Sequence, residues 1–199
     1  MKKVIILCLI IISLFVFCSC TPDTPNLTLE EEYELLISDK TPIDPFQVTF
    51  VYDITKLEKV IGFSDYVFVG KVTGYLGTIN DTPSGIPETL YSVSVLENIK
   101  GNLITNKNIE LLKDGGLSEN RKRKSMLVGD TMPKIGDYYI FLVFASKDGE
   151  IKATHGKTVN KIENIRDFYE DDEYKKVLQA YENEEVFDRV RYKSIYEQG

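Results

Sequence analysis

The sequence predicts a mainly β protein of the α+β class, in which a small five-stranded β-barrel is flanked by N-terminal and C-terminal helices. Three observations support this prediction. Short segments rich in Val, Phe and Tyr follow one another between residues 63 and 160, and turns containing Gly, Pro or Asn separate them. Segments with apolar residues at helical spacing lie on both sides of this region. The chain has 199 residues, 43% of them hydrophobic and 28% charged, which allows a buried core and argues against disorder.

A helical and extended segment is expected over residues 27–62, before the barrel. Thr28 and Glu31, three residues apart, form a capping box, and apolar residues then recur at helical spacing as far as residue 38. Two prolines end this helix, and residues 46–52 alternate as an extended strand does. A two-turn helix is expected over residues 57–61, where a glycine follows.

The barrel strands are expected within residues 63–160. The first strand contains Gly70 and Gly74, which suit a strand that bends strongly around a small barrel. The expected strands cover residues 66–76, 90–99, 108–113, 138–145 and 150–154. Asp148-Gly149 is typical of a tight hairpin between the last two strands.

The tail over residues 161–199 interleaves charges with apolar residues at helical intervals. We expect two amphipathic helices here, divided near residue 171 or near residue 183. Their apolar faces are expected to dock on the barrel, because a helix face of this kind usually packs on its own domain.

Residues 1–19 have the pattern of a secretory signal peptide. Lys2 and Lys3 supply the positive start, and an apolar run of 14 residues follows over residues 4–17. As a helix this run spans about 21 Å, which is short of the roughly 30 Å of a bilayer core. The run is therefore expected to belong to a cleaved leader.

The sequence Phe17-Cys18-Ser19-Cys20 resembles the lipobox of bacterial lipoproteins. The resemblance implies that Cys20, which follows a small residue, receives diacylglycerol and becomes the new N-terminus. Cys18 fits this role less well because it follows a bulky residue, and Phe17 departs from the aliphatic residue that the family prefers there. Residues 20–26, rich in Pro, Thr and Asp, are expected to form a tether. A signal peptide without a lipid, or an N-terminal anchor helix, remains an alternative.

Location and charge restrict the expected partners. Two acyl chains on Cys20 would hold the protein at the extracytoplasmic face of the cell membrane. The chain has 24 basic and 31 acidic residues. Because Lys2 and Lys3 would leave with the leader, 22 basic residues remain and the net charge of the mature chain is −9. A surface this acidic argues against nucleic acid as a partner. We expect the membrane as one partner, and an envelope protein or an anionic wall polymer as a second.

The residues that usually carry catalysis are few. All three cysteines lie in the first 20 residues, and His155 is the single histidine. Gly156-Lys157-Thr158 fails as a phosphate-binding loop, because Ile151 stands where that motif needs a glycine. We therefore expect His155 to be a solvated turn residue, and we expect no catalytic residue, metal site or cofactor.

Two charged clusters leave alternatives open. The acidic residues 170–173 are expected to form a solvated helix junction, with calcium binding as the alternative. Arg121, Lys122, Arg123 and Lys124 form the one basic run. This run is either a mobile, solvated loop or a contact for an anionic ligand near the membrane.

The order of the strand and turn segments resembles the netrin and tissue-inhibitor-of-metalloproteinase module, an OB-type barrel. The segments that carry this resemblance are residues 64–72, 91–96, 100–102, 115–116 and 136–142. Because Cys20 would be acylated and far from the barrel, metalloproteinase inhibition is not expected. Our leading hypothesis is a lipid-anchored, non-catalytic binding or assembly module, and because OB-type barrels bind on one strand face and its adjoining loops, we expect binding through residues 78–88 and 117–133. The alternative is a surface hydrolase acting on cell wall or peptide.

Overall fold

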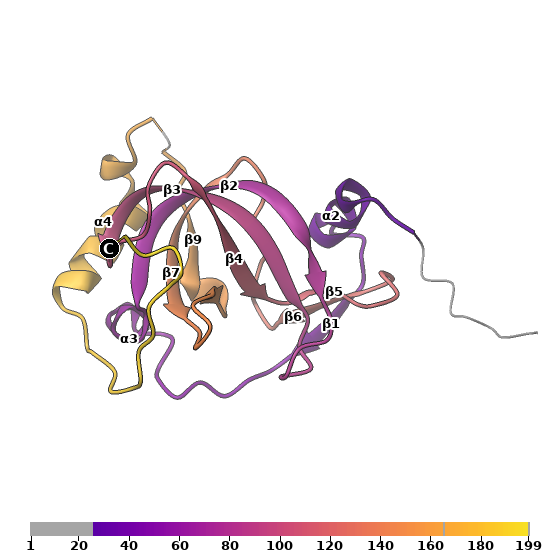
Figure 1. Ribbon diagram of the computed structural model, residues 1–199, viewed down its shortest axis with the longest axis horizontal. Helices are drawn as coiled ribbons and strands as arrows, with labels where there is room; N and C mark the ends of the chain where they lie inside the picture. The colour runs from indigo at the N-terminus through magenta and orange to yellow at the C-terminus, as the bar shows by residue number, and fades with distance from the viewer. Residues whose placement is uncertain (1–25, 165, 199) are drawn as a thin grey trace, which may run out of the picture.

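A computed structural model describes residues 26–164 and 166–198, which fold around a closed β-barrel (Figure 1). The barrel strands are β2 (Tyr66–Ile79), β3 (Glu88–Lys100), β4 (Asn108–Asp114), β7 (Tyr138–Ala145) and β8 (Ile151–Ala153). They follow one another in the order β2-β3-β4-β8-β7, and the pairing of β7 with β2 closes the ring. Only β4 and β8 pair in parallel among these neighbours. The predicted small OB-like barrel of the α+β class is confirmed.

The barrel interior is filled by alternate residues of its strands. In β3 the buried side chains alternate with partly exposed ones, as the period of two in a strand dictates. Phe68 of β2 and Phe141 of β7 stack inside the barrel with ring centroids 5.3 Å apart. Gly70 allows β3 to pack closely at this level, because a Cβ there would lie 2.8 Å from a methyl group of Val93.

A second core lies outside the barrel. Strands β2 and β7 are buried on both faces, because α3 (Leu57–Phe63) and α4 (Asp172–Glu182) cover their outer side. Val60 and Val177 of these helices pack there against Val69 and Ile140. The predicted short helix after residue 56 and a docked helix in the C-terminal tail are thus confirmed.

The opposite end of the molecule carries α2 (Leu29–Ile37) and a small sheet (Figure 1). The predicted capping box is present: the Thr28 backbone N–H donates to Glu31 Oε2 at 2.8 Å, and the Glu31 N–H donates to Thr28 Oγ1 at 3.3 Å. The small sheet has the order β1-β6-β5. Its strands are β1 (Ile43–Phe46), β6 (Lys124–Leu127) and β5 (Gly116–Leu117).

The extended strand expected at residues 46–52 lies earlier in the chain, as β1. This strand contains Pro45, one of the two prolines predicted to end the helix before it. Because β1 is an edge strand that pairs with β6 alone, the missing N–H of Pro45 does not break a sheet.

The prediction of two C-terminal helices is wrong in part. One α-helix, α4, forms in the described part of residues 161–199, together with β9 (Val159–Lys161) at its start and the single 3₁₀ turn η2 (Phe168–Glu170). Residues 184–198, here called the C-terminal strap, run across the barrel without regular structure. Asp65 holds the strap through Arg189 at 2.7 Å and Arg191 at 2.9 Å. The strap is thus held by side-chain bonds to Asp65, whereas the predicted second helix would have been held by its own backbone hydrogen bonds.

Several expectations fall on residues outside the described part. The leader, Cys18, Cys20 and the tether up to residue 25 belong to this group. Among the residues that the structure does describe, no helix has the length and apolar character needed to cross a bilayer.

Candidate functional site

Two neighbouring pockets lie beside the segment that connects β6 to β7. The first, called the His155 pocket, has a volume of about 290 Å³, and the second, called the Lys124 pocket, about 230 Å³. Both are lined by Asp130 and Thr131, so the two pockets flank this pair of residues. The His155 pocket lies next to η1 (Gly156–Thr158), and the Lys124 pocket lies between α2 and β6. Residues 117–133, one of the two segments expected to bind, therefore line both pockets.

His155 is buried, with 1% of its surface exposed, so the prediction of a solvated turn histidine is wrong. The chain between β1 and α3 covers it. Phe50 meets the imidazole edge-on with centroids 4.7 Å apart, and the Tyr52 hydroxyl lies 3.1 Å from Nε2. Nδ1 has no hydrogen-bond partner among the described residues.

The backbone around His155 is fixed by Thr158. The Thr158 hydroxyl donates to the His155 carbonyl at 2.6 Å and accepts from the His155 N–H at 3.2 Å. Burial lowers the pKa of His155 to about 4, and the positive charges of Lys113 and Lys157 act in the same direction. The imidazole is therefore neutral at pH 7.

A buried ion pair borders the same pocket. The Lys113 ammonium donates to an Asp130 carboxylate oxygen, and their side chains are 0% and 2% exposed. The Asp130 carboxylate also accepts from the Thr131 N–H at 2.7 Å. This pair was not predicted from the sequence. In β4, Lys113 follows Ile109 and Leu111 at intervals of two residues, so its side chain points to the same, inner face of the strand. This alternation is the sequence feature from which a buried lysine could have been predicted.

The basic run Arg121, Lys122, Arg123 and Lys124 bonds mainly to the N-terminal elements. Arg121 Nε donates to Glu32 of α2 at 2.7 Å, and Arg123 Nε donates to Asp44 of β1 at 2.6 Å. Lys124 lies in β6, is 5% exposed, and donates at 2.9 Å to each of two carbonyls at the C-terminal end of α2. Lys122 is exposed, and its side chain makes no hydrogen bond to another described residue.

These contacts change the interpretation of the basic run. Neither a mobile loop nor an open anionic contact describes Lys124, because its ammonium is enclosed and caps a helix end. Burial lowers the pKa of Lys124, and the nearby Asp39 acts in the opposite direction. Three of the four basic side chains therefore fasten α2 and β1 to the β5–β6 hairpin.

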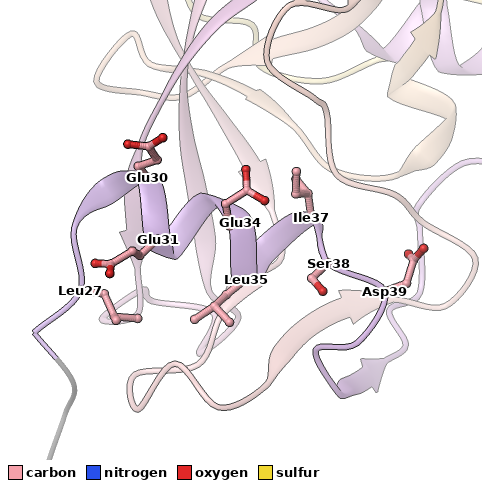
Figure 2. A pocket seen from close by; sticks show the side chains of 8 residues that line it. All are labelled: Leu27, Glu30, Glu31, Glu34, Leu35, Ile37, Ser38 and Asp39. Atoms are coloured by element: carbon pink, nitrogen blue, oxygen red, sulfur yellow. The ribbon is translucent and has the colours of Figure 1, made fainter.

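The outer face of α2 carries a wider and more acidic depression of about 810 Å³ (Figure 2). Its lining residues all come from α2 and the residues beside it, and they are Leu27, Glu30, Glu31, Glu34, Leu35, Ile37, Ser38 and Asp39. Figure 2 shows the carboxylates of Glu30 and Glu34 on the same side of the helix. Because four of these side chains are acidic, this surface repels anionic ligands.

The acidic residues 170–173 form a helix junction as predicted, but the prediction that it is solvated is wrong for Asp171, which is 7% exposed. Asp171 is the N-cap of α4 and accepts from the backbone N–H groups of Glu163, Asn164 and Glu173 at 2.9 to 3.0 Å. Burial opposes ionisation of Asp171, but these backbone bonds bring its pKa below the usual value. Within residues 26–164 and 166–198, no group of three or more His, Cys, Asp or Glu side chains could hold a metal ion.

The second segment expected to bind, residues 78–88, lines neither the His155 pocket nor the Lys124 pocket. The barrel face formed by β3 and β4 is partly covered by the C-terminal strap. Ile195 and Tyr196 of the strap line a pocket of about 90 Å³ together with Leu90 and Leu112 of these strands. The strap therefore occupies part of the face that OB-type barrels use for binding.

No protein-family model matches the chain, and no curated protein matches it. The function of this chain is therefore inferred from its residues and their geometry.

Proposed function

We propose that this chain is a lipid-anchored, extracytoplasmic binding module without catalysis, attached to the cell membrane through Cys20. The observation that supports binding is the His155 pocket, where a buried polar floor lies below an apolar edge. His155 and Asp130 belong to the floor, and Leu127 and Val128 to the edge. The lining combines three apolar side chains with polar and charged ones, and ligand sites combine apolar walls with fixed polar groups in this way.

The resemblance of residues 17–20 to a lipobox supports the location. The barrel end that carries both pockets is connected to the tether through α2, which begins at residue 29. A module anchored there would meet ligands and envelope proteins close to the membrane surface. An anionic wall polymer is the less favoured partner, because binding it through Arg121 or Lys124 would break the bonds that hold α2.

A surface hydrolase is the alternative, and one observation favours it: a histidine and a carboxylate, His155 and Asp130, line one pocket. The hydrogen bonds of these groups argue against it. Nε2 of His155 lies within hydrogen-bond distance of Tyr52, and the Asp130 carboxylate accepts from Lys113. No serine stands among the described residues that line this pocket. A hydrolase of the Ser-His-Asp type needs all three groups in mutual contact.

The anchor is tested with labelled palmitate in cells that express the wild type, Cys20→Ala or Cys18→Ala. We expect label and membrane retention in the wild type and in Cys18→Ala, and loss of both in Cys20→Ala. Membrane retention of Cys20→Ala, with no label in the wild type, would refute the anchor.

Binding is tested by placing a photoreactive amino acid at Val128, which is 60% exposed at the pocket edge, and a control at Val186, which is 67% exposed on the strap. After irradiation of intact cells, we expect a discrete adduct from position 128 and a weaker one from position 186. Equal adducts from both positions would argue against this pocket as the binding surface.

A further inference from the structure

The outer face of α2 carries open apolar surface. Tyr33 and Leu36 of the inner face are buried in the barrel core. On the outer face, Leu27, Leu35 and Ile37 stay partly exposed and line the depression of about 810 Å³, here called the α2 groove. Every residue that lines this groove belongs to α2 or to its immediate neighbours in the chain, so no other described element covers it.

The shape of the α2 groove suits a second helix. Its side chains form two rows along the helix (Figure 2), and these rows are Glu30, Glu34 and Ile37 on one side and Leu27, Glu31 and Leu35 on the other. Residues within a row are three or four positions apart, which is the spacing of the ridges on a helix surface. When two helices pack, a ridge of one fits the groove between two ridges of the other. With nine residues, α2 is about 14 Å long and offers about two and a half turns of contact.

The charge of the α2 groove restricts the partner. Four of its eight lining residues are acidic and none is basic. Two of the four have a role within the chain, because Glu31 completes the capping box and Asp39 lies near the Lys124 ammonium. Glu30 and Glu34 form no ion pair with another described residue, and they lie four positions apart, where like charges on a helix repel.

Capping does not explain Glu34. This residue lies in the last turn of α2, where the helix dipole disfavours a negative charge, and no basic residue accompanies it in that turn. A cationic group on a partner would offset both this effect and the repulsion from Glu30. The apolar side chains between the carboxylates would at the same time gain an apolar contact.

We infer that the α2 groove binds a cationic amphipathic helix of a partner protein. The apolar ridge of that helix packs on Leu27 and Leu35, and its Lys or Arg side chains face Glu30 and Glu34. A contact of this length is smaller than a standard protein interface, so we expect weak and reversible binding. The inference goes beyond the proposed function, because it depends neither on the lipid anchor nor on the His155 pocket.

The test titrates the full-length protein, labelled with ¹⁵N and held in non-ionic detergent micelles, with helical peptides of about 15 residues. The probe peptide contains Ala, Leu and Lys, with Leu along one face and Lys on both sides of it. One control peptide has Glu in place of Lys. A second control has the composition of the probe in an order that spreads Leu around the helix. We expect the probe to shift the amide resonances of α2 saturably, and both controls to bind at least about tenfold more weakly.

Glu30→Gln/Glu34→Gln tests the charge and leaves the capping box intact. Glu110→Gln/Glu182→Gln is the matched control, since both residues are exposed, lie outside the α2 groove and form no ion pair in the described part of the chain. We expect the first double variant to weaken probe binding about three- to tenfold, as the loss of two exposed ion pairs would, and the second to bind as the wild type does. Raising the salt concentration from about 0.05 M to about 0.5 M should remove most of this difference.

Equal affinity for either control peptide, or equal weakening in the two double variants, would overturn the inference. A shift of the α2 resonances when the protein is concentrated without peptide would indicate a second copy of the chain as the occupant, and would also overturn it. Absence of a lipid on Cys20 would refute the anchor and leave each of these results unchanged.

Discussion

Acidification from pH 7 to pH 4 is expected to destabilise the fold through His155. Its pKa is about 4 in the folded chain and about 6.5 in an unfolded one. Between these values the unfolded chain binds a proton that the folded chain excludes, so stability falls as the pH falls. The stabilisation of the folded chain by the neutral imidazole is fully present above about pH 6.5 and is lost by about pH 4. A difference of about 2.5 units corresponds to about 3 kcal/mol of unfolding free energy.

The cause of this effect is the enclosure of the ring. His155 is 1% exposed, and Phe50 and Tyr52 cover it. A protonated imidazole would also be repelled by the ammonium groups of Lys113 and Lys157. Protonation therefore requires the covering segment to open.

The assay is urea unfolding of the wild type and of His155→Phe at intervals between pH 7 and pH 4. Carboxylates titrate in both proteins, so the difference between the two isolates His155. We expect that difference to change by about 3 kcal/mol across the range. Parallel pH profiles would refute the reasoning. Because the variant could lose stability for other reasons, an NMR titration of the wild-type ring serves as a second measurement, and a midpoint near pH 6.5 would also refute it.

Three further predictions concern contacts that hold the barrel together. Lys113→Met should cost about 3 to 5 kcal/mol in urea unfolding because it leaves Asp130 buried without its partner, and the double variant Lys113→Met/Asp130→Leu should recover most of the loss; no recovery would contradict the pair. Lys124→Met should cost about 1 to 3 kcal/mol and speed hydrogen exchange in α2, whose last carbonyls lose their donor; unchanged exchange would speak against this anchor. Asp65→Asn should speed exchange in the C-terminal strap without speeding it in β3, because the carboxylate that holds Arg189 and Arg191 loses its charge; uniform exchange in both segments would show that this carboxylate does not secure the strap.

The barrel was predictable because its strands carry local signals. In β3 the apolar residues recur every second position, and the turn at residues 100–102 contains Gly101 with a φ of 78°, where a Cβ would collide with the Tyr66 ring. The capping box at Thr28 likewise depends on residues three positions apart. Such signals act within a few residues and can be seen in one sequence.

The site could not be predicted to the same degree, because its contacts join distant segments. His155 is buried by Tyr52, which precedes it by 103 residues, and Lys124 bonds to Leu36, which precedes it by 88. A run of four basic residues is typical of a solvated surface. Here Glu32 and Asp44, which accept hydrogen bonds from this run, lie about 80 to 90 residues earlier in the chain, so the sequence alone does not pair them with it. The C-terminal strap has helical spacing, but its arginines bond to Asp65 instead.

The proposed function depends most on the proposed attachment of the chain to the membrane through Cys20. Intact-protein mass spectrometry of the chain purified from membranes measures this directly. We expect one mature form that begins at Cys20 and carries the mass of diacylglycerol with or without a further acyl chain. A chain that retains residues 1–19, or that begins at Cys20 without lipid, would contradict it.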